Sequence, residues 1–287
     1  MKKFAPTLVL VAALLLQSCA SVINFMDPNG PVYQGSYAHV MQADTAEIKV
    51  VSYNIAWAKK ASLATQELQH FPKIRGADII FLQEMDMASV DLMARELGYN
   101  YIYHPGSIHN VNDKDIGNAI LSRWQLTDGK KIIFPHKQSW NDRIRTATVA
   151  TVHINDKRIR AYNVHTATIM MSEDKQLDQL ESVVDDVRPN YDYVIIGGDF
   201  NTARPGSIKS VNALFVGAGF ERATERAGFT ARAFGLIPFT LDHIYIKGLD
   251  VVDCGTVEQA QASDHLPLWT TLRFEPPVPQ LVNGRMF

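Results

Sequence analysis

Short apolar runs that contain many β-branched residues recur along most of the chain. Such runs are typical of strands, because β-branched and aromatic side chains fit a pleated, half-buried surface. The predicted strands are 47–54, 78–83, 117–122, 145–154, 157–164, 192–197, 241–246 and 266–274. Asn155 and Asp156 lie between two of these runs and predict a tight hairpin turn.

Between the strands, apolar residues recur with the period of a helix. Two stretches place them on one face: Val90, Met93, Ala94 and Leu97 in the first, and Leu177, Leu180, Val184 and Val187 in the second. Ser172, which is followed by Glu173 and Asp174, is the predicted N-cap of the second helix. This alternation predicts a single α/β domain in which helices cover packed sheets.

The N-terminus has the pattern of an export signal. Lys2 and Lys3 precede the apolar run from Leu8 to Leu16, which as a helix would reach only about 14 Å, half of a bilayer core. A basic start, a short apolar run and small residues are typical of a secretory signal peptide. The residues up to Cys19 also resemble the bacterial lipobox, so we expect a signal peptide over 1–18 and a lipid on Cys19. The alternative is an ordinary signal peptide.

The residues after Cys19 bear on where the protein would be anchored. Ala20 stands where many lipoproteins retained in the inner membrane carry an acidic residue, so the resemblance favours the outer membrane of a bacterium. Several acyl chains on one cysteine would give a stable anchor. Residues 19–46 lack periodicity and predict a tether, 47–274 the globular domain, and the proline-rich 275–287 a surface strap or disordered tail.

Composition and charge narrow the possible partners. The chain is 46% hydrophobic and 20% charged, with a formal net charge of −2 that becomes −4 if Lys2 and Lys3 are removed. These are values of a globular protein, and they supply no overall attraction to nucleic-acid phosphate, so no stable nucleic-acid partner is expected. Two cysteines exclude a disulfide framework and a cysteine-rich zinc module. We expect a monomer.

Polar residues at the ends of the predicted strands carry the candidate chemistry. They are Asn54, Glu84, Asp199, Asn201, Asp264 and His265. Buried strands place functional groups at their carboxyl ends, so these side chains are expected to form one oxygen-rich site. Such oxygen ligands favour Mg²⁺ or Mn²⁺ over zinc. A metal of this kind beside a histidine base suits the hydrolysis of a phosphate ester.

The order of these motifs resembles that of the endonuclease/exonuclease/phosphatase superfamily. Besides Asn54 and Glu84, the matching stretches are GNAILSR at 117–123, YNVHT at 162–166, GDFN at 198–201, LDHIY at 241–245 and SDH at 263–265. The resemblance covers nearly all of 47–274. It implies a four-layer sandwich of two packed mixed β-sheets flanked by helices.

The resemblance also implies a metal site and a base. Glu84 would ligate Mg²⁺ or Mn²⁺ directly. Asn54 would lie beside it, either as a ligand or in contact with a ligand, and Asp264 would belong to the same metal site. His265 would take the proton of the attacking water, oriented by Asp242. The sequence leaves open whether Asp242 or its neighbour His243 is the functional residue of this motif.

The same resemblance implies how the phosphate is held. Asp199 and Asn201 would position the water and bind a phosphate oxygen, and His165 would contact the phosphate and assist the leaving oxygen. Asn118 and Arg145 complete the expected substrate-binding set. In pancreatic-type deoxyribonucleases the second histidine has a carboxylate partner, whereas this chain offers Arg145 at about that position.

Several functions remain open at this point. The leading hypothesis is a metal-dependent phosphodiesterase anchored in the cell envelope. Nucleases, enzymes acting on phospholipid or sphingomyelin, phosphatases of small esters and a non-catalytic binding lipoprotein are alternatives. No exposed aromatic hairpin for entering a bilayer is evident, and Trp57 and Trp140 are candidates for the rim of the site. Arg143 and Arg145 either bind an anionic substrate or are plain surface charges.

Overall fold

The computed structural model describes residues 22–39, 46–108, 113–138, 141–168, 170–233 and 235–274, and the short pieces 281–282 and 285–286. The predicted signal peptide, Cys19 and Trp140 lie outside the described residues. So does most of the predicted tail, of which the short strands β16 (Leu281–Val282) and β17 (Arg285–Met286) pair with each other.

Seven strands form the first sheet. Their order is β1 (Tyr33–Gly35), β4 (Asn100–Ile108), β5 (Asp115–Ser122), β3 (Ile79–Met85), β2 (Glu47–Asn54), β15 (Leu268–Phe274) and β14 (Leu249–Thr256). β2 and β3 are parallel, and the other neighbours are antiparallel. The sheet is therefore mixed, as predicted.

Six strands form the second sheet. Their order is β10 (Glu221–Arg222), β13 (Asp242–Lys247), β9 (Tyr193–Asp199), β8 (Lys157–His165), β7 (Thr146–Ile154) and β6 (Gln125–Ile133). β8 and β9 are parallel and the other pairs antiparallel. Each sheet thus contains one parallel pair whose carboxyl ends lie at the same edge.

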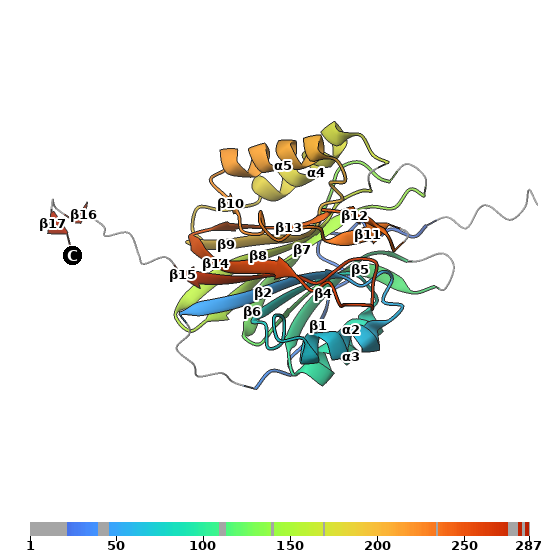
Figure 1. Cartoon of the computed structure of the whole chain (residues 1–287), viewed down its shortest axis with the longest axis horizontal. Helices are drawn as coiled ribbons and strands as arrows, with labels where there is room; N and C mark the ends of the chain where they lie inside the picture. Colours follow the sequence, from blue (N-terminus) through green and yellow to red (C-terminus); the bar gives the residue numbers. More distant parts are fainter. Residues whose placement is uncertain are drawn as a thin grey trace, which may run out of the picture.

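Helices cover the outer face of each sheet, so the molecule has four layers (Figure 1). α2 (Ala61–His70) and α3 (Met87–Leu97) pack on the first sheet, and α4 (Glu173–Val184) and α5 (Pro205–Gly217) pack on the second. A separate apolar cluster, which includes Phe81 and Ile195, fills the space between the sheets. This is the predicted four-layer sandwich. No helix among the described residues is long and apolar enough to cross a bilayer.

Local sequence explains where the predicted helices begin and end. The side chain of Asp86 caps α3 by accepting a hydrogen bond from the Ser89 N–H at 2.9 Å, and Gly98 ends the helix in the left-handed conformation. Ser172 does occupy the N-cap position of α4, but its side chain makes no capping hydrogen bond. The predicted hairpin turn at Asn155 and Asp156 joins β7 to β8.

The segment before the domain differs from the predicted tether. Within 19–46, residues 22–39 lie against the first sheet: β1 pairs with β4, and the Phe25 N–H donates to the Gly106 carbonyl at 2.9 Å. Lys131 donates to the carbonyls of Phe25 and Gly30 at 2.9 and 2.8 Å. Backbone groups that lack helical or hairpin patterns are satisfied here by long-range partners, which the local sequence did not reveal.

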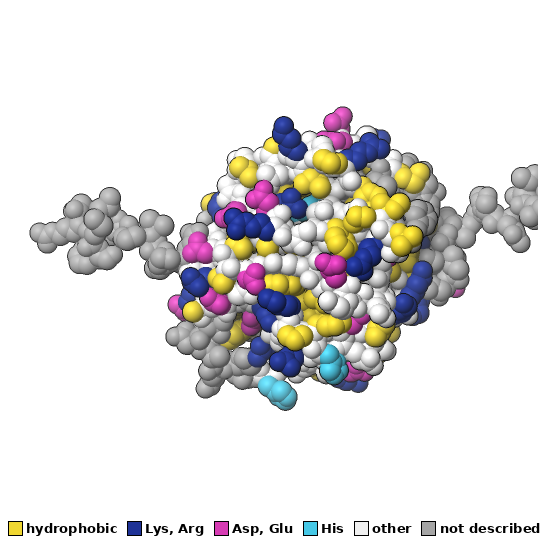
Figure 2. All heavy atoms as spheres, in the orientation of Figure 1, with side chains coloured by type: hydrophobic (Ala, Val, Ile, Leu, Met, Phe, Trp, Pro, Cys, Tyr) yellow, Lys and Arg dark blue, Asp and Glu magenta, His cyan; other side chains and the backbone are white. Residues whose placement is uncertain are grey.

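The surface carries charges of both signs. On the face shown in Figure 2, lysine and arginine side chains are interspersed with aspartate and glutamate. Hydrophobic side chains gather over the hairpin of β11 (Ala231–Ala233) and β12 (Ile237–Phe239). The mixed surface agrees with the net charge of −2.

Candidate active site

The polar strand ends meet in one cavity of ≈ 380 Å³. Its wall includes these predicted residues: Asn54, Glu84, His165, Asp199, Asn201, Asp264 and His265. Trp57, one of the two predicted rim residues, also lines it. Asp242 lies behind His265, at the start of β13. The structure therefore brings together residues separated by more than half of the sequence.

Glycine allows β8 and β9 to deliver their end residues side by side. Gly198 has φ +142°, and a Cβ there would lie 1.9 Å from the Val164 carbonyl oxygen. No other residue fits this position without moving the backbone. The parallel register consequently places His165 directly beside Asp199.

The backbone around Glu84 is also unusual. Glu84 has φ +57° at a point where the pairing of β3 with β5 shifts register between Leu82 and Met85. The loop after β2 has three successive left-handed residues, Ala56, Trp57 and Ala58, with φ 44°, 66° and 52°. Left-handed conformations in residues other than glycine cost free energy and cluster at functional sites. They aim Glu84 and the 56–58 loop at the cavity.

Asp199 is the centre of the polar network. Its Oδ1 accepts a hydrogen bond from the Asn201 N–H at 2.9 Å, and its Oδ2 accepts one from Asn54 Nδ2 at 3.0 Å. The Nε2 atoms of His165 and His265 lie 3.5 and 3.8 Å from Oδ2. Burial raises the pKa of Asp199, and the charge of Asp242 adds to this, while His265 and the hydrogen bonds oppose it.

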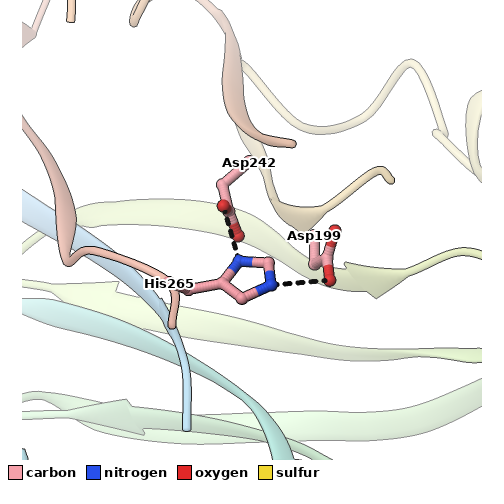
Figure 3. Close-up of side chains that lie close together, drawn as sticks. All are labelled: Asp199, Asp242 and His265. Atoms are coloured by element: carbon pink, nitrogen blue, oxygen red, sulfur yellow. Dashed lines mark hydrogen bonds and ion pairs between the residues drawn. The ribbon is translucent and has the colours of Figure 1, made fainter. Parts of the chain in front are cut away.

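His265 is held by a carboxylate (Figure 3). Its Nδ1 lies 2.9 Å from Asp242 Oδ2, while Nε2 faces Asp199 and the cavity. Burial disfavours the charged ring, but Asp242 and Asp199 outweigh it and raise the pKa of His265. Thr230 supports the pair, because its Oγ1 accepts a hydrogen bond from the Asp242 N–H at 3.0 Å.

His165 has the opposite kind of neighbour. Arg145 Nη1 lies 2.9 Å from its Nε2 and 3.1 Å from its Nδ1. Burial lowers the pKa of His165 well below its usual value, and the charges of Arg145 and His265 lower it further. His165 is thus a neutral ring beside a guanidinium. Arg145 does stand next to this histidine, as its place in the sequence suggested.

The structure distinguishes between Asp242 and His243 as the residue that contributes to the site. The His243 Nε2 is hydrogen-bonded to Thr202 Oγ1 at 2.6 Å, and its ring packs 5.3 Å from that of Phe200. It is fully buried on the side of the helix layer. His243 therefore belongs to the core, and Asp242 is the member of the pair that reaches the site.

Two predicted substrate-binding residues have their donors engaged within the protein. Asn118 Nδ2 donates to the Thr146 carbonyl at 2.8 Å, and Asn118 lines a small adjoining pocket instead of the main cavity. Asn201 Nδ2 donates to the Thr166 carbonyl at 3.1 Å. Substrate binding by Asn118 and Asn201 stays a prediction. Because their Nδ2 groups already donate within the protein, their side-chain oxygens are better placed than these donors to contact a substrate.

The residues present suit a hard divalent cation. Ligand atoms of Asp199, Asp242 and His265 all lie within 4.8 Å of one another. Glu84, Asp264 and Asn54 add oxygens to the same cavity, although Asn54 Oδ1 already accepts the Ala56 N–H at 3.0 Å. Burial raises the pKa of Glu84, because it disfavours the charged carboxylate. A cation bound beside the carboxylate would compensate this charge. Oxygen-rich sets of this kind fit Mg²⁺ or Mn²⁺.

Sequence reasoning missed the residues that support the site from a distance. Thr230 and Asn24 are examples: Asn24 Oδ1 accepts the Ile144 N–H at 3.1 Å, and its Nδ2 donates to the Asp142 carbonyl at 2.9 Å. Neither has a local sequence signal, because both act through tertiary contacts.

Comparison with known proteins agrees with this geometry. A model described as the Endonuclease/Exonuclease/phosphatase family matches residues 51–265. A UPF0294 protein of Yersinia pseudotuberculosis is 31% identical over 133 residues, which are 46% of this chain and 49% of that protein. A UPF0294 protein of Yersinia enterocolitica is 28% identical over 133 residues, with the same coverage of 46% and 49%. The match thus spans about half the length of these curated relatives.

Solved structures share the fold. An endonuclease/exonuclease/phosphatase from Beutenbergia cavernae has a TM-score of 0.62 at 16% identity, covering 80% of this chain and 72% of that one. TDP2 of D. rerio, complexed with a single strand DNA product, has a TM-score of 0.64 at 17% identity, covering 80% and 100%. ANGEL2, a 2′,3′-cyclic phosphatase, has a TM-score of 0.62 at 17% identity, covering 79% and 95%. At identities this low the likeness shows the fold alone.

Proposed function

Because this chain belongs to the endonuclease/exonuclease/phosphatase family, whose members hydrolyse phosphate esters, we propose that it is a Mg²⁺- or Mn²⁺-dependent phosphodiesterase of the cell envelope. The observation that carries this proposal is the pair of His265 and Asp242, set 2.9 Å apart with the free ring nitrogen facing the cavity.

His265 is suited to accept a proton from water. Asp242 holds Nδ1, so Nε2 is the atom that is presented to the cavity, 3.8 Å from Asp199 Oδ2. The carboxylate stabilises the imidazolium that forms when the ring takes the proton. Asp199, fixed by Asn54 and Asn201, would orient the water that loses it.

The opposite wall would hold the phosphate. His165, which Arg145 contacts from the adjoining pocket, would face the phosphate oxygens on which negative charge grows, and pre-placed polar groups bind the transition state better than the ground state. When bound, a divalent cation held by Glu84, Asp264 and Asn54 would supply further positive charge to these oxygens. The intact set of Glu84, Asp199, Asp264 and His265 argues against a non-catalytic binding lipoprotein.

The envelope location rests on the N-terminal sequence. Lys2, Lys3, the apolar run and Cys19 together support export and lipid attachment, with the outer membrane favoured by Ala20. Because residues 22–39 are bound to the domain, the active site would stand close to the membrane surface.

One observation favours a phospholipid or sphingomyelin phosphodiester as the substrate. In the hairpin of β11 and β12, Leu236 and Ile237 are 85% and 51% exposed. It adjoins the base, since the Arg232 N–H donates to the Asp264 carbonyl at 2.8 Å. No exposed aromatic hairpin is evident in the sequence, whereas this hairpin is exposed and aliphatic. Aliphatic side chains beside a site are suited to a lipid surface.

A nuclease is the weaker alternative. The D. rerio structure holds a single strand DNA product, but the net charge of −2 gives this chain no general attraction to a polyanion.

Hydrolysis of a substrate panel tests the proposal. The panel contains bis-p-nitrophenyl phosphate, plasmid DNA, sphingomyelin vesicles and inositol phosphates, each with Mg²⁺, with Mn²⁺ and with chelator. We expect metal-dependent release of product from at least one diester. Inertness toward the whole panel in both metals, with a folded protein, would reject the proposed function.

A further inference from the structure

A second, smaller pocket adjoins the main cavity. It has a volume of ≈ 30 Å³ and shares His165 with the main cavity, and its wall includes Arg143, Arg145 and Asn118. Arg143 does not line the main cavity. A space of this size holds about two water-sized atoms, such as two oxygens of a phosphate group. It is too small for a base or an acyl chain.

Among the described residues, Arg143 is a buried cation without an ion-pair partner. The residue is 6% exposed, and its guanidinium lies 4.7 Å from the ring centre of Trp57. Among the described residues, no hydrogen-bond acceptor serves its Nε and no carboxylate lies within ion-pair distance of it. Burial lowers the pKa of Arg143, and the charge of Arg145 lowers it further, while the more distant charge of Glu84 opposes this without forming an ion pair. A buried charge left in this way costs folding free energy.

Arg145 repeats the pattern on the other side of the pocket. Its Nη1 donates to His165, but its Nε also has no acceptor among the described residues. Two guanidinium groups that repel each other are therefore packed side by side with donors still unused. An anion between them would satisfy the donors and compensate both charges.

Hydrogen bonds to the backbone hold Arg143 in place before any anion arrives. Asn24 bonds to the chain on both sides of Arg143, through the Asp142 carbonyl at 2.9 Å and the Ile144 N–H at 3.1 Å. The Gln138 N–H donates to the Arg143 carbonyl at 2.8 Å. Such preorganisation lowers the entropy lost on binding.

We propose that Arg143 and Arg145 form an anion subsite for a second phosphate group of the substrate, next to the phosphate that is hydrolysed. The choice of phosphate rests on the proposed function. Preferred substrates would then carry two phosphate groups, one at the Asp199 and His265 centre and one in the arginine pocket, so a phospholipid with two phosphates would be preferred to sphingomyelin, which has one.

Binding of inorganic phosphate tests the subsite without any catalysis. Titration calorimetry is run in chelator, where the carboxylates of the main cavity repel anions, on wild type, Arg143→Met, Arg143→Lys and the exposed control Arg188→Met. We expect one phosphate per wild-type chain and at least about tenfold weaker binding in Arg143→Met, the factor expected for a charge-assisted hydrogen bond. Arg143→Lys should lose less, and Arg188→Met nothing.

Melting temperatures separate binding from packing. Removing an uncompensated buried cation should leave Arg143→Met as stable as wild type or more stable, whereas a purely structural arginine would make it less stable. Phosphate should raise the melting temperature of wild type but not of Arg143→Met. Absence of phosphate binding to wild type at millimolar concentrations, or equal binding by Arg143→Met, would overturn the subsite.

A matched pair of esters tests the second phosphate in the reaction. The pair is thymidine 5′-(p-nitrophenyl phosphate) with and without a 3′-phosphate. We expect the 3′-phosphate to raise kcat/KM, and Arg143→Met to bring the ratio of the two esters close to one. An unchanged ratio in Arg143→Met rejects the subsite. Phosphate binding with neither ester hydrolysed in Mg²⁺ or Mn²⁺ would instead count against the proposed function.

Discussion

At the scale of single residues, the two histidines of the site have opposite neighbours. His265 faces Asp242 at 2.9 Å, and His165 faces Arg145 at 2.9 Å. A carboxylate stabilises a protonated ring, whereas a guanidinium disfavours one. We therefore expect His265 to be the proton acceptor of the pair, whereas His165 is a neutral ring that contacts Arg145 and adjoins Asp199.

The first prediction follows from this division. His265→Ala should lower turnover by about 10²–10⁴-fold, the usual contribution of general base catalysis. His165→Ala should lose less, because the base, its carboxylate partner and the candidate metal ligands all remain. Rate per folded molecule is measured together with the melting temperature. A folded His265→Ala protein within a few-fold of wild type would contradict the assignment of the base.

Glu84 should govern the dependence on metal. Glu84→Gln keeps the shape of the side chain and its strained backbone but removes the charge that would ligate the cation directly. We expect a Mg²⁺ titration shifted to higher concentration together with a lower maximal rate, and chelator should abolish the wild-type activity. Unaltered titration and rate in Glu84→Gln would show that this residue is not a ligand.

The site residues that could be predicted all stand at the ends of apolar runs. Asn54 and Asp199 could be read from the sequence because a polar residue at the end of a buried strand is a local pattern, and His265 because it directly precedes an apolar run. Arg143 over Trp57 could not be predicted as a pair, because their contact at 4.7 Å depends on how loops from different sheets pack. Its burial likewise has no local signal.

At the scale of elements, the same distinction holds. β2 was predicted with its exact bounds, Glu47–Asn54, because its residues are almost all buried. β6 was missed because Asp128, Gly129 and Lys130 interrupt its pattern, and its pairing with β7 shifts register there. A strand whose residues face both solvent and core is stabilised by pairing with neighbouring strands. This pairing cannot be read from the sequence of one segment alone.

Substitution of Gly198 tests whether the close approach of β8 and β9 requires glycine at this position. Gly198→Ala should lower the free energy of unfolding by about 3 kcal/mol or more, since its Cβ would overlap the Val164 carbonyl and φ is positive. Gly206→Ala in α5 is the matched control, because nothing lies within 4 Å of a Cβ there. That change should be neutral or stabilise by up to about 1 kcal/mol. Denaturant unfolding measures both, and equal effects would refute the steric argument.

At the scale of the whole molecule, attachment to the membrane is the next prediction. Cys19→Ser should move the protein from the membrane fraction to the soluble fraction or stall its processing, because it removes the predicted site of acylation. Cys254→Ser, in the partly buried edge strand β14, is the control and should not change fractionation. Intact mass of the mature protein provides the decisive measurement. An unmodified chain that begins elsewhere than at Cys19 would reject the lipoprotein.

Polar groups are buried at the edge of the sandwich where β4 and β6 lie. His104 of β4 is buried, and its Nδ1 has no hydrogen-bond partner among the described residues. Lys131 of β6, on the facing sheet, ties the N-terminal segment to the domain through the Phe25 and Gly30 carbonyls. Burial lowers the pKa of His104 from 6.5 to about 4, and the charge of Lys131 adds to this. Protonation of His104 is therefore unfavourable in the folded protein.

The last prediction concerns stability in acid. Because the pKa of His104 is lower in the folded than in the unfolded protein, the unfolded chain binds the extra proton between pH 6.5 and about 4. Stability should consequently fall as the pH falls through this window, by up to about 3 kcal/mol from this residue. His104→Gln cannot titrate, so the difference in unfolding free energy between wild type and variant should be constant above pH 7 and shift in favour of the variant below pH 6.5. Denaturant unfolding across this pH range measures it, and parallel curves for the two proteins would show that His104 does not control acid stability.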